Sequence, residues 1–317
     1  MSQEGTHMTI QVFDKIRSLD FGSSQASGRI TVVPLEGHLA GPVYMTMSQA
    51  LENGQLEVTE LDGGASVPEL LARNKATVHV LILDGEELIG AMQNRVLNTA
   101  VLLAPNSETR IPVSCTESGR WSKASKAFTD SDEVMPFTVR SRMKDRVFES
   151  LRYGRRDAGQ SQVWSDIDTM MRDYRTSSPT SALKDTTRQY RQSLDESTQS
   201  FHVGENQVGA CVFIDGRVAG MELVSTPAAF QMLWPRLIRS YAMDSRRLSQ
   251  RESAQEGSHR ERAKQLVEEV STTTWEEFDG VGSGRDLRLG HDRASGSALA
   301  LEGDVIHMSV TNSRITA

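Results

Sequence analysis

The side chains that could do chemistry gather between residues 84 and 121. Three carboxylates lie at a turn, amide and guanidinium side chains interrupt the apolar run that follows, and a carboxylate, a guanidinium and an indole end the next one. These candidates are Asp84, Glu86, Glu87, Gln93, Asn94, Arg95, Asn98, Glu117, Arg120 and Trp121. Amides are disfavoured inside strands, so the pattern indicates that specific partners satisfy them.

One interpretation of this cluster is a ligand-binding site. A guanidinium offers five donors in a rigid fork, so Arg95 and Arg120 would hold phosphate groups. The indole of Trp121 would stack on a planar base, and one of the carboxylates would act as a general acid or base. The substrate class that fits these side chains is a small nucleotide-derived molecule.

A second interpretation makes the same cluster structural. Glu86 or Glu87 would pair with Arg95 across a hairpin, the amides would bond to loop backbone, and Trp121 would lie in the core. Ion-pair networks also concentrate charged side chains, so residue types alone leave both interpretations open.

The elements that must position these residues are strands. Short apolar runs predict strands over residues 29–35, 56–61, 78–83, 88–97, 100–103 and 109–116. Asp84-Gly85 is a favoured tight-turn pair, and loops of two to six residues separate the later runs. A meander or a sandwich is the natural arrangement of such strands.

The middle of the chain is helical. Apolar side chains recur at helical spacing over residues 140–152 and 162–175, whereas residues 181–200 are polar and predict an exposed helix or arm. These helices form an insert at about residues 136–200.

The C-terminal third returns to strands. Residues 207–223 predict a hairpin around Asp215-Gly216, and a helix follows the N-cap pair Thr226-Pro227. A charged helix near residues 259–270 and strands over residues 272–278, 285–289, 297–301 and 305–310 complete the pattern. The expected fold is α+β, with a β-rich N-terminal half, a helical insert, and a C-terminal hairpin, helix and strands that complete the sheet. We expect a flexible lead-in over residues 1–28 and a single domain over residues 29–317.

Composition narrows the class of protein. The net charge of −7 argues against bulk nucleic-acid binding. No apolar run is long enough to cross a membrane, and the chain shows no secretory signal. Two cysteines, Cys115 and Cys211, cannot form a disulfide framework, and no cysteine and histidine spacing predicts a metal site. We therefore expect a cytoplasmic protein with no metal.

Two further features carry weaker alternatives. Residues 140–156 have a net charge of +5, which could serve a phosphate or RNA but is more typical of a solvated helix face. Cys115 could be a nucleophile if Arg95 or a histidine lowered its pKa, although a small residue on a buried strand is usually inert. His79 and His307 lie in apolar strands, where a core histidine is the ordinary interpretation.

Two segments of the candidate cluster carry a family resemblance. DGEELIGAMQNRVLN at residues 84–98 and IPVSCTESGRW at residues 111–121 resemble the bacterial and archaeal family associated with ADP-ribosylglycohydrolases and with rhodanese/phosphatase-superfamily proteins. QVW at residues 162–164, NQVGACVFIDGRVAGMEL at 206–223, LWPRLIRSYAMD at 233–244 and SALALEGDVIHMSV at 297–310 extend the resemblance from Ile30 to the C-terminus. The chain has Met92 where the family has a lysine.

The resemblance implies a metabolic context rather than a reaction. The proteins with which the family is associated imply ADP-ribose or NAD-derived metabolism, which is an argument from association. The resemblance implies no catalytic residue and no cofactor. We expect a protein that binds an ADP-ribose-like or NAD-like ligand through residues 84–121. The alternative is a non-catalytic structural or interaction module that forms a homo-oligomer, and RNA binding is the least favoured function.

Overall fold

The computed structural model describes residues 13–61, 68–120, 125–248, 258–291 and 294–312. The chain divides into two compact units. Unit 1 comprises Met1–Gly41, Leu194–Asp279 and Gly284–Ala317, and unit 2 comprises Pro42–Ser193 and Gly280–Ser283. Whether the two units fold as one domain, as we expect for residues 29–317, stays a prediction. No helix among the described residues is long and apolar enough to cross a membrane.

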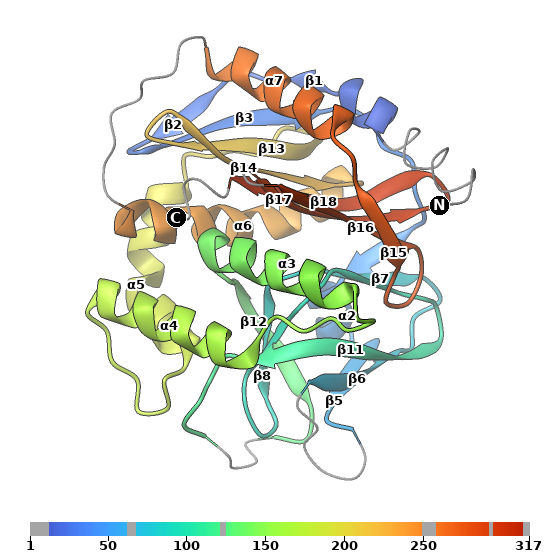
Figure 1. The fold of residues 1–317 in the computed structure, drawn as a ribbon, viewed down its shortest axis with the longest axis vertical. Helices are drawn as coiled ribbons and strands as arrows, with labels where there is room; N and C mark the ends of the chain where they lie inside the picture. The colour runs from blue at the N-terminus through green and yellow to red at the C-terminus, as the bar shows by residue number, and fades with distance from the viewer. Residues whose placement is uncertain (1–12, 62–67, 121–124, 249–257, 292–293, 313–317) are drawn as a thin grey trace. The chain divides into compact units, whose positions relative to one another are not determined.

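Unit 1 is built on one antiparallel sheet that joins the two ends of the chain (Figure 1). Its path is β1-β3-β13-β14-β18-β17-β16-β15, with β2 also paired to β3. The bounds are β1 Asp20–Phe21, β2 Gln25–Ser27, β3 Ile30–Glu36, β13 Gln207–Ile214, β14 Arg217–Val224, β15 Glu276–Asp279, β16 Arg285–His291, β17 Ala294–Leu301 and β18 Asp304–Asn312. Because β13 pairs with β3, the C-terminal strands complete a sheet begun near the N-terminus, as predicted.

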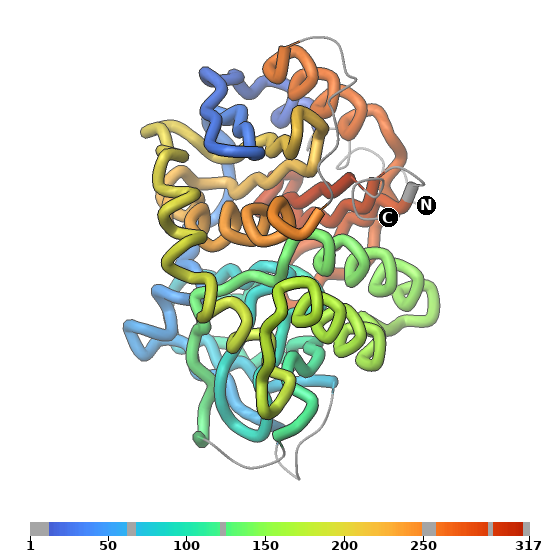
Figure 2. Tube along the Cα trace, turned by 90° about the vertical axis from the view of Figure 1, so that its left-hand side faces the viewer, coloured from blue at the N-terminus to red at the C-terminus, as the bar shows by residue number. Residues whose placement is uncertain are grey.

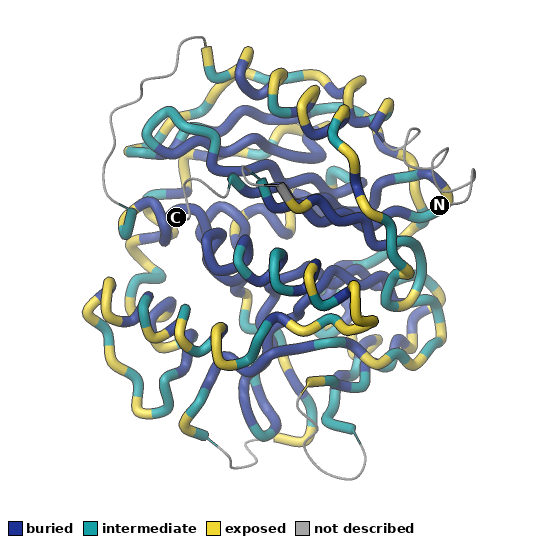
Figure 3. The backbone as a smooth tube through the Cα atoms, viewed as in Figure 1, coloured by how far each residue is buried: buried dark blue, intermediate teal, exposed yellow. Residues whose placement is uncertain are grey.

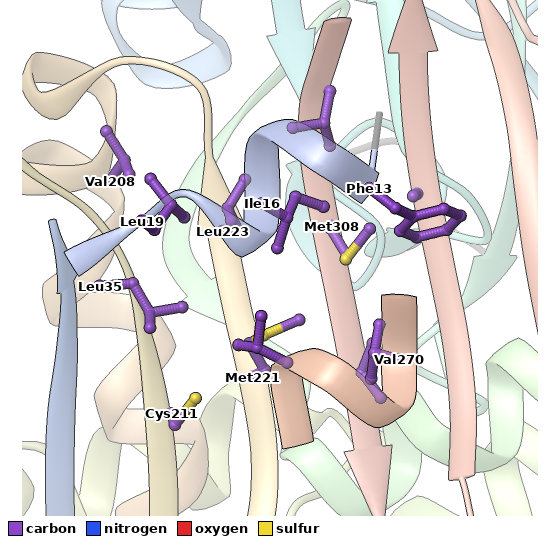
Figure 4. Close-up of a cluster of buried hydrophobic side chains, with 14 of the residues drawn as sticks. Phe13, Ile16, Leu19, Leu35, Val208, Cys211, Met221, Leu223, Val270 and Met308 are labelled. Atoms are coloured by element: carbon purple, nitrogen blue, oxygen red, sulfur yellow. The ribbon is translucent and has the colours of Figure 1, made fainter. Parts of the chain in front are cut away.

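One face of this sheet carries the core of unit 1. Figure 4 shows Leu35, Met221 and Met308 of the sheet gathered with Ile16 and Val270. The sequence predicts a flexible lead-in over residues 1–28, but the described part of that segment differs: residues 13–17 are helical, and Ile16 is fully buried. The prediction followed the serines and glycines of this segment and overlooked three spaced apolar side chains, Phe13, Ile16 and Leu19, which are part of the core.

Local sequence explains the hairpin and helices of unit 1. Asp215 and Gly216 both have positive φ, as the two-residue turn between β13 and β14 requires. Thr226 caps α6 (Pro227–Arg247), whose chain runs alongside β13 and β14 in Figure 2. Helix α7 (His259–Thr272) begins with a capping box at Ser258.

Unit 2 contains two sheets. The smaller has the order β10-β7-β4, and the larger has the order β12-β8-β9-β11-β6-β5. The bounds are β4 Tyr44–Thr46, β5 Leu56–Thr59, β6 Glu69–Asn74, β7 His79–Ile82, β8 Glu86–Gly90, β9 Arg95–Leu97, β10 Val101–Leu103, β11 Ser107–Cys115 and β12 Phe128–Val134. The single strand predicted over residues 88–97 is two strands, because residues 91–94 turn the chain from β8 into β9.

Helices of unit 2 are α2 (Met47–Glu52), α3 (Phe137–Leu151), α4 (Gln160–Tyr174) and the first part of α5 (Leu183–Thr198). Helices α3 and α4 lie side by side in Figures 1 and 2. The prediction of an exposed helix or arm over residues 181–200 is wrong for one face of α5. Leu183, Thr186, Thr187 and Leu194 are buried, so threonines take core positions that apolar periodicity does not reveal.

The observed class is α+β, as predicted from the sequence. Burial follows the layers: strands such as β13 are dark along their length in Figure 3, and the outer faces of α4 and α7 are exposed. The candidate residues at positions 84–120 all lie in unit 2, in and around β8, β9 and β11.

Candidate functional site

The strands β8, β9 and β11 present two different faces. In one row of the register, Glu87 lies opposite Val96, which lies opposite Ser114. In the next row, Leu88 lies opposite Arg95, which lies opposite Cys115. Side chains of successive residues point to opposite faces of a strand, so Glu87 and Arg95 face opposite sides of the sheet.

The face with Arg95 is mostly apolar. Leu88, Leu97 and Val113 of this face belong to the core of unit 2. The other face, which we call the polar face, carries Glu87, Asn98, Ser114 and Thr116, all buried.

The turn before β8 is packed against α3. Lys144 of α3 lies 3.7 Å from the carboxylate of Asp84, and both side chains are buried. Gly85 has φ +83°, and a Cβ there would lie 2.4 Å from Cδ of Arg140. The prediction of a solvated face for the basic run at residues 140–156 is wrong for these two cations, because α3 turns them toward this turn.

Glu87 is the most perturbed carboxyl of the cluster. It is fully buried, and its Oε1 accepts a hydrogen bond of 2.7 Å from the Thr116 hydroxyl. The pKa of Glu87 is raised to about 7: burial is the main cause and the neighbouring Glu133 carboxylate adds to it, while Thr116, Ser131 and Lys184 act in the opposite direction. The Ser131 hydroxyl is close enough to lower this pKa, but among the described residues Oε2 accepts no hydrogen bond of normal geometry.

A compact network surrounds the turn between β8 and β9. Arg120 donates to Glu117 (2.9 Å), to the carbonyl of Ala91 (3.0 Å) and to Oδ1 of Asn94 (3.2 Å). Burial raises the pKa of Glu117, but hydrogen bonds from Arg120, Thr180 and the Asn94 amide outweigh it, so the pKa lies below its usual range.

Gln93 closes this network from the side of β11. Its Nε2 donates 2.8 Å to the carbonyl of Glu117, the residue after the Thr116 that holds Glu87. Its Oε1 is buried and, within the described part of the chain, has no hydrogen-bond partner. Two buried acceptors without partners, one on Glu87 and one on Gln93, thus belong to side chains anchored on consecutive residues.

Arg95 is held on the apolar face. Its guanidinium donates to the sulfur of Cys115 and lies 3.4 Å from Glu60. Burial raises the pKa of the Cys115 thiol, although Arg95 acts in the opposite direction. A buried thiol with a raised pKa is a poor nucleophile, so the structure favours the inert interpretation of Cys115.

Helix α4 and its approach cover the edge of β11. The side chain of Gln160 accepts a hydrogen bond from the Cys115 amide (2.7 Å) and donates one to the Cys115 carbonyl (2.9 Å). It thus makes the pair of bonds that a residue of an adjacent strand would make. Asn98 accepts from the Ser114 hydroxyl (2.9 Å) and donates to the carbonyl of Arg156 (3.0 Å). The helical insert therefore covers the polar face.

The structure brings the candidates together only in part. Asp84 lies at the turn before β8, and Glu86, the first residue of β8, accepts a hydrogen bond from the Leu83 amide. Gln93, Asn94, Glu117 and Arg120 form one network, Glu87 and Asn98 lie on the polar face, and Arg95 lies on the opposite one. Trp121 lies outside the described residues.

Sequence reasoning missed the partners supplied by the helical insert, β12 and the end of β11. These are Thr116, Glu133, Lys144, Gln160, Thr180, Lys184 and Arg191. One signal was present for α5: Leu183, Thr186, Thr187 and Leu194 are spaced to share a helix face. No group of three potential metal ligands occurs among the described residues.

Comparison with known proteins agrees with the family resemblance. The model of one family, described as the ARG and Rhodanese-Phosphatase-superfamily-associated Protein domain (ARPP-1), matches residues 18–311. No match was found among curated proteins or among solved structures.

Proposed function

We propose, from the premise that the chain belongs to the family of ARG and Rhodanese-Phosphatase-superfamily-associated proteins, that it binds a small nucleotide-derived ligand at the polar face of unit 2. ADP-ribose and NAD are the ligands that the family's name favours. The part of the ligand that reaches the polar face presents hydrogen-bond donors, such as ribose hydroxyls or an amide.

The observation that carries this proposal is the pair of buried acceptors without partners, Oε2 of Glu87 and Oε1 of Gln93. Burying an acceptor without a hydrogen bond costs about 1–3 kcal/mol, so such atoms need an explanation. Both acceptors belong to side chains anchored on the consecutive residues 116 and 117. A ligand hydroxyl or amide N–H would satisfy them.

Phosphate binding by the two arginines receives less support. Arg95 is fully buried on the apolar face with Cys115 and Glu60, and Arg120 already donates to three acceptors. A phosphate would have to displace these contacts. We therefore assign ligand recognition to the unpartnered acceptors of Glu87 and Gln93, and we assign the two arginines a structural role.

Titration calorimetry and thermal shift with ADP-ribose, NAD and nucleotides test the proposal. Glu87→Gln replaces the Oε2 acceptor by an amide donor of the same shape, so the affinity for the bound ligand falls at least tenfold. Glu108→Gln is the matched control, because Glu108 is an exposed carboxylate on strand β11 of the same sheet. It leaves the affinity unchanged.

Two results would count against the proposal. One is a folded protein whose melting temperature is unmoved by millimolar concentrations of every ligand in this set. The other is binding that Glu87→Gln and Glu108→Gln weaken equally.

A structural role for the cluster is the second candidate, and the satisfied part of the network favours it. Arg120, Glu117, Asn94 and Asn98 each have local hydrogen-bond partners, as structural glue would. In this version the protein is a non-catalytic module that associates with itself. Light scattering at micromolar concentration tests the self-association, and a strict monomer removes that part of the alternative.

A further inference from the structure

Residues 175–193 lie against the edge of the polar face. Within unit 2 this segment contains the loop after α4 and the first eleven residues of α5. Two of its residues, Arg175 and Ser181, have φ of +52°, a backbone conformation that residues other than glycine adopt only at a cost in free energy. These two strained positions bracket the loop.

The segment is attached to the sheet by polar contacts at two places. At the first, the Thr180 carbonyl accepts from the amides of Ser118 (3.1 Å) and Gly119 (2.9 Å), and the Leu183 amide donates 3.1 Å to the Thr116 carbonyl. These backbone bonds tie the loop to the end of β11, next to the residue that holds Glu87.

At the second place, Arg191 of α5 bridges two acidic residues of β12. One guanidinium nitrogen lies 2.6 Å from Glu133, and the other contacts Asp132. Between the two attachments, Thr186 and Thr187 are buried in place of large apolar side chains. The segment buries only two apolar side chains, Ala182 and Leu183. Attachment by a few polar contacts with so few buried apolar side chains is typical of segments that open locally at low free-energy cost.

We propose that residues 175–193 form a lid, fastened at residues 116–119 and at Glu133, which opens to admit the ligand to Glu87. The inference rests on the proposed function for the identity of the ligand, but the lid itself is tested without any ligand. The charged groups that face Glu87 are Glu133 of β12 and Lys184 of the lid.

Hydrogen exchange of the ligand-free protein, resolved by residue, tests the lid. Arg191→Gln removes the second attachment. Gly119→Ala disturbs the first, because its Cβ would lie 2.9 Å from Cα of Thr180 and the lid backbone must shift. Arg188→Gln, which replaces an exposed arginine of the same helix, is the matched control.

In both test variants the backbone amides of Ser118, of position 119 and of Leu183 should exchange at least tenfold faster than in the wild type. The amides that join β11 to β6 should exchange at the wild-type rate, and the control variant should match the wild type throughout. Equal rates in all variants would overturn the lid, as would an acceleration spread evenly over unit 2.

Ligand binding is measured separately by stopped-flow association of ADP-ribose. With a lid, association is at least threefold faster in Arg191→Gln than in Arg188→Gln. Equal association rates in a protein that binds ADP-ribose would contradict gating by these residues. Fast lid exchange in a protein that binds no ADP-ribose supports the lid and counts against the proposed ligand, so the two failures are distinguishable.

Discussion

The protonation of Glu87 makes a quantitative prediction about stability. The pKa is raised from 4.5 to about 7 in the folded protein because the carboxyl is fully buried. A shift of this size corresponds to roughly 3 kcal/mol of free energy between the two protonation states. Below pH 4.5 the carboxyl is protonated in both the folded and the unfolded chain, and no penalty arises.

The sign of the pH dependence follows from proton binding. Between pH 4.5 and 7 the folded protein holds a proton that the unfolded chain has released, so this group makes the free energy of unfolding fall as pH rises. Above pH 7 Glu87 is ionised in both states, and the full penalty of roughly 3 kcal/mol remains. Glu87→Gln keeps the shape and an acceptor for Thr116 but cannot ionise.

We therefore expect Glu87→Gln to stabilise the protein at about pH 8 by up to roughly 3 kcal/mol, and by less than about 1 kcal/mol at about pH 5. Urea denaturation of the wild type and the variant at both pH values measures the difference. Glu108→Gln, at an exposed carboxylate, should show no comparable dependence on pH. The reasoning is refuted if the advantage of Glu87→Gln is absent at the higher pH or equal at both.

Two further substitutions test the packing of the cluster. Gly85→Ala should lower the free energy of unfolding by about 2–3 kcal/mol, because φ is +83° and the new Cβ would clash with the buried Arg140. Gly54→Ala is the control, since Gly54 also has a positive φ but a Cβ there meets no other atom. In the same denaturation assay this control should lose about 1 kcal/mol. Arg120→Gln leaves the buried Glu117 without its cation and should cost about 2 kcal/mol at neutral pH. Since the folded pKa of Glu117 is lowered, that loss should shrink as pH falls through the folded pKa, and a constant loss in acid would contradict the pairing.

The sequence by itself determined where most elements lie and which class of fold they form. The hairpin at Asp215-Gly216, the capped start of α6 after Thr226, and the buried strand β7 follow from turn chemistry, capping and short apolar runs. Each of these signals depends on a few neighbouring residues. The family resemblance could likewise be recognised from the sequence, in the segments around β8 and β11.

The predicted strand over residues 88–97 shows where local patterns stop. Gln93 and Asn94 interrupt the apolar run because they lie in the turn between β8 and β9, not within one strand. That turn changes the register, and the register decides that Arg95 and Glu87 face opposite sides. The candidates therefore do not share one face, although they are neighbours in sequence.

Only the tertiary structure decided the chemical state of the cluster. The pKa of Glu87 depends on burial beneath the helical insert, on Glu133 of β12, on Lys184 of α5 and on Thr116 at the end of β11. These groups come from distant parts of the chain, and no local sequence pattern predicts which of them lie next to Glu87. Turns and helices are specified by near neighbours, whereas desolvation and charge pairing depend on what packs above a side chain.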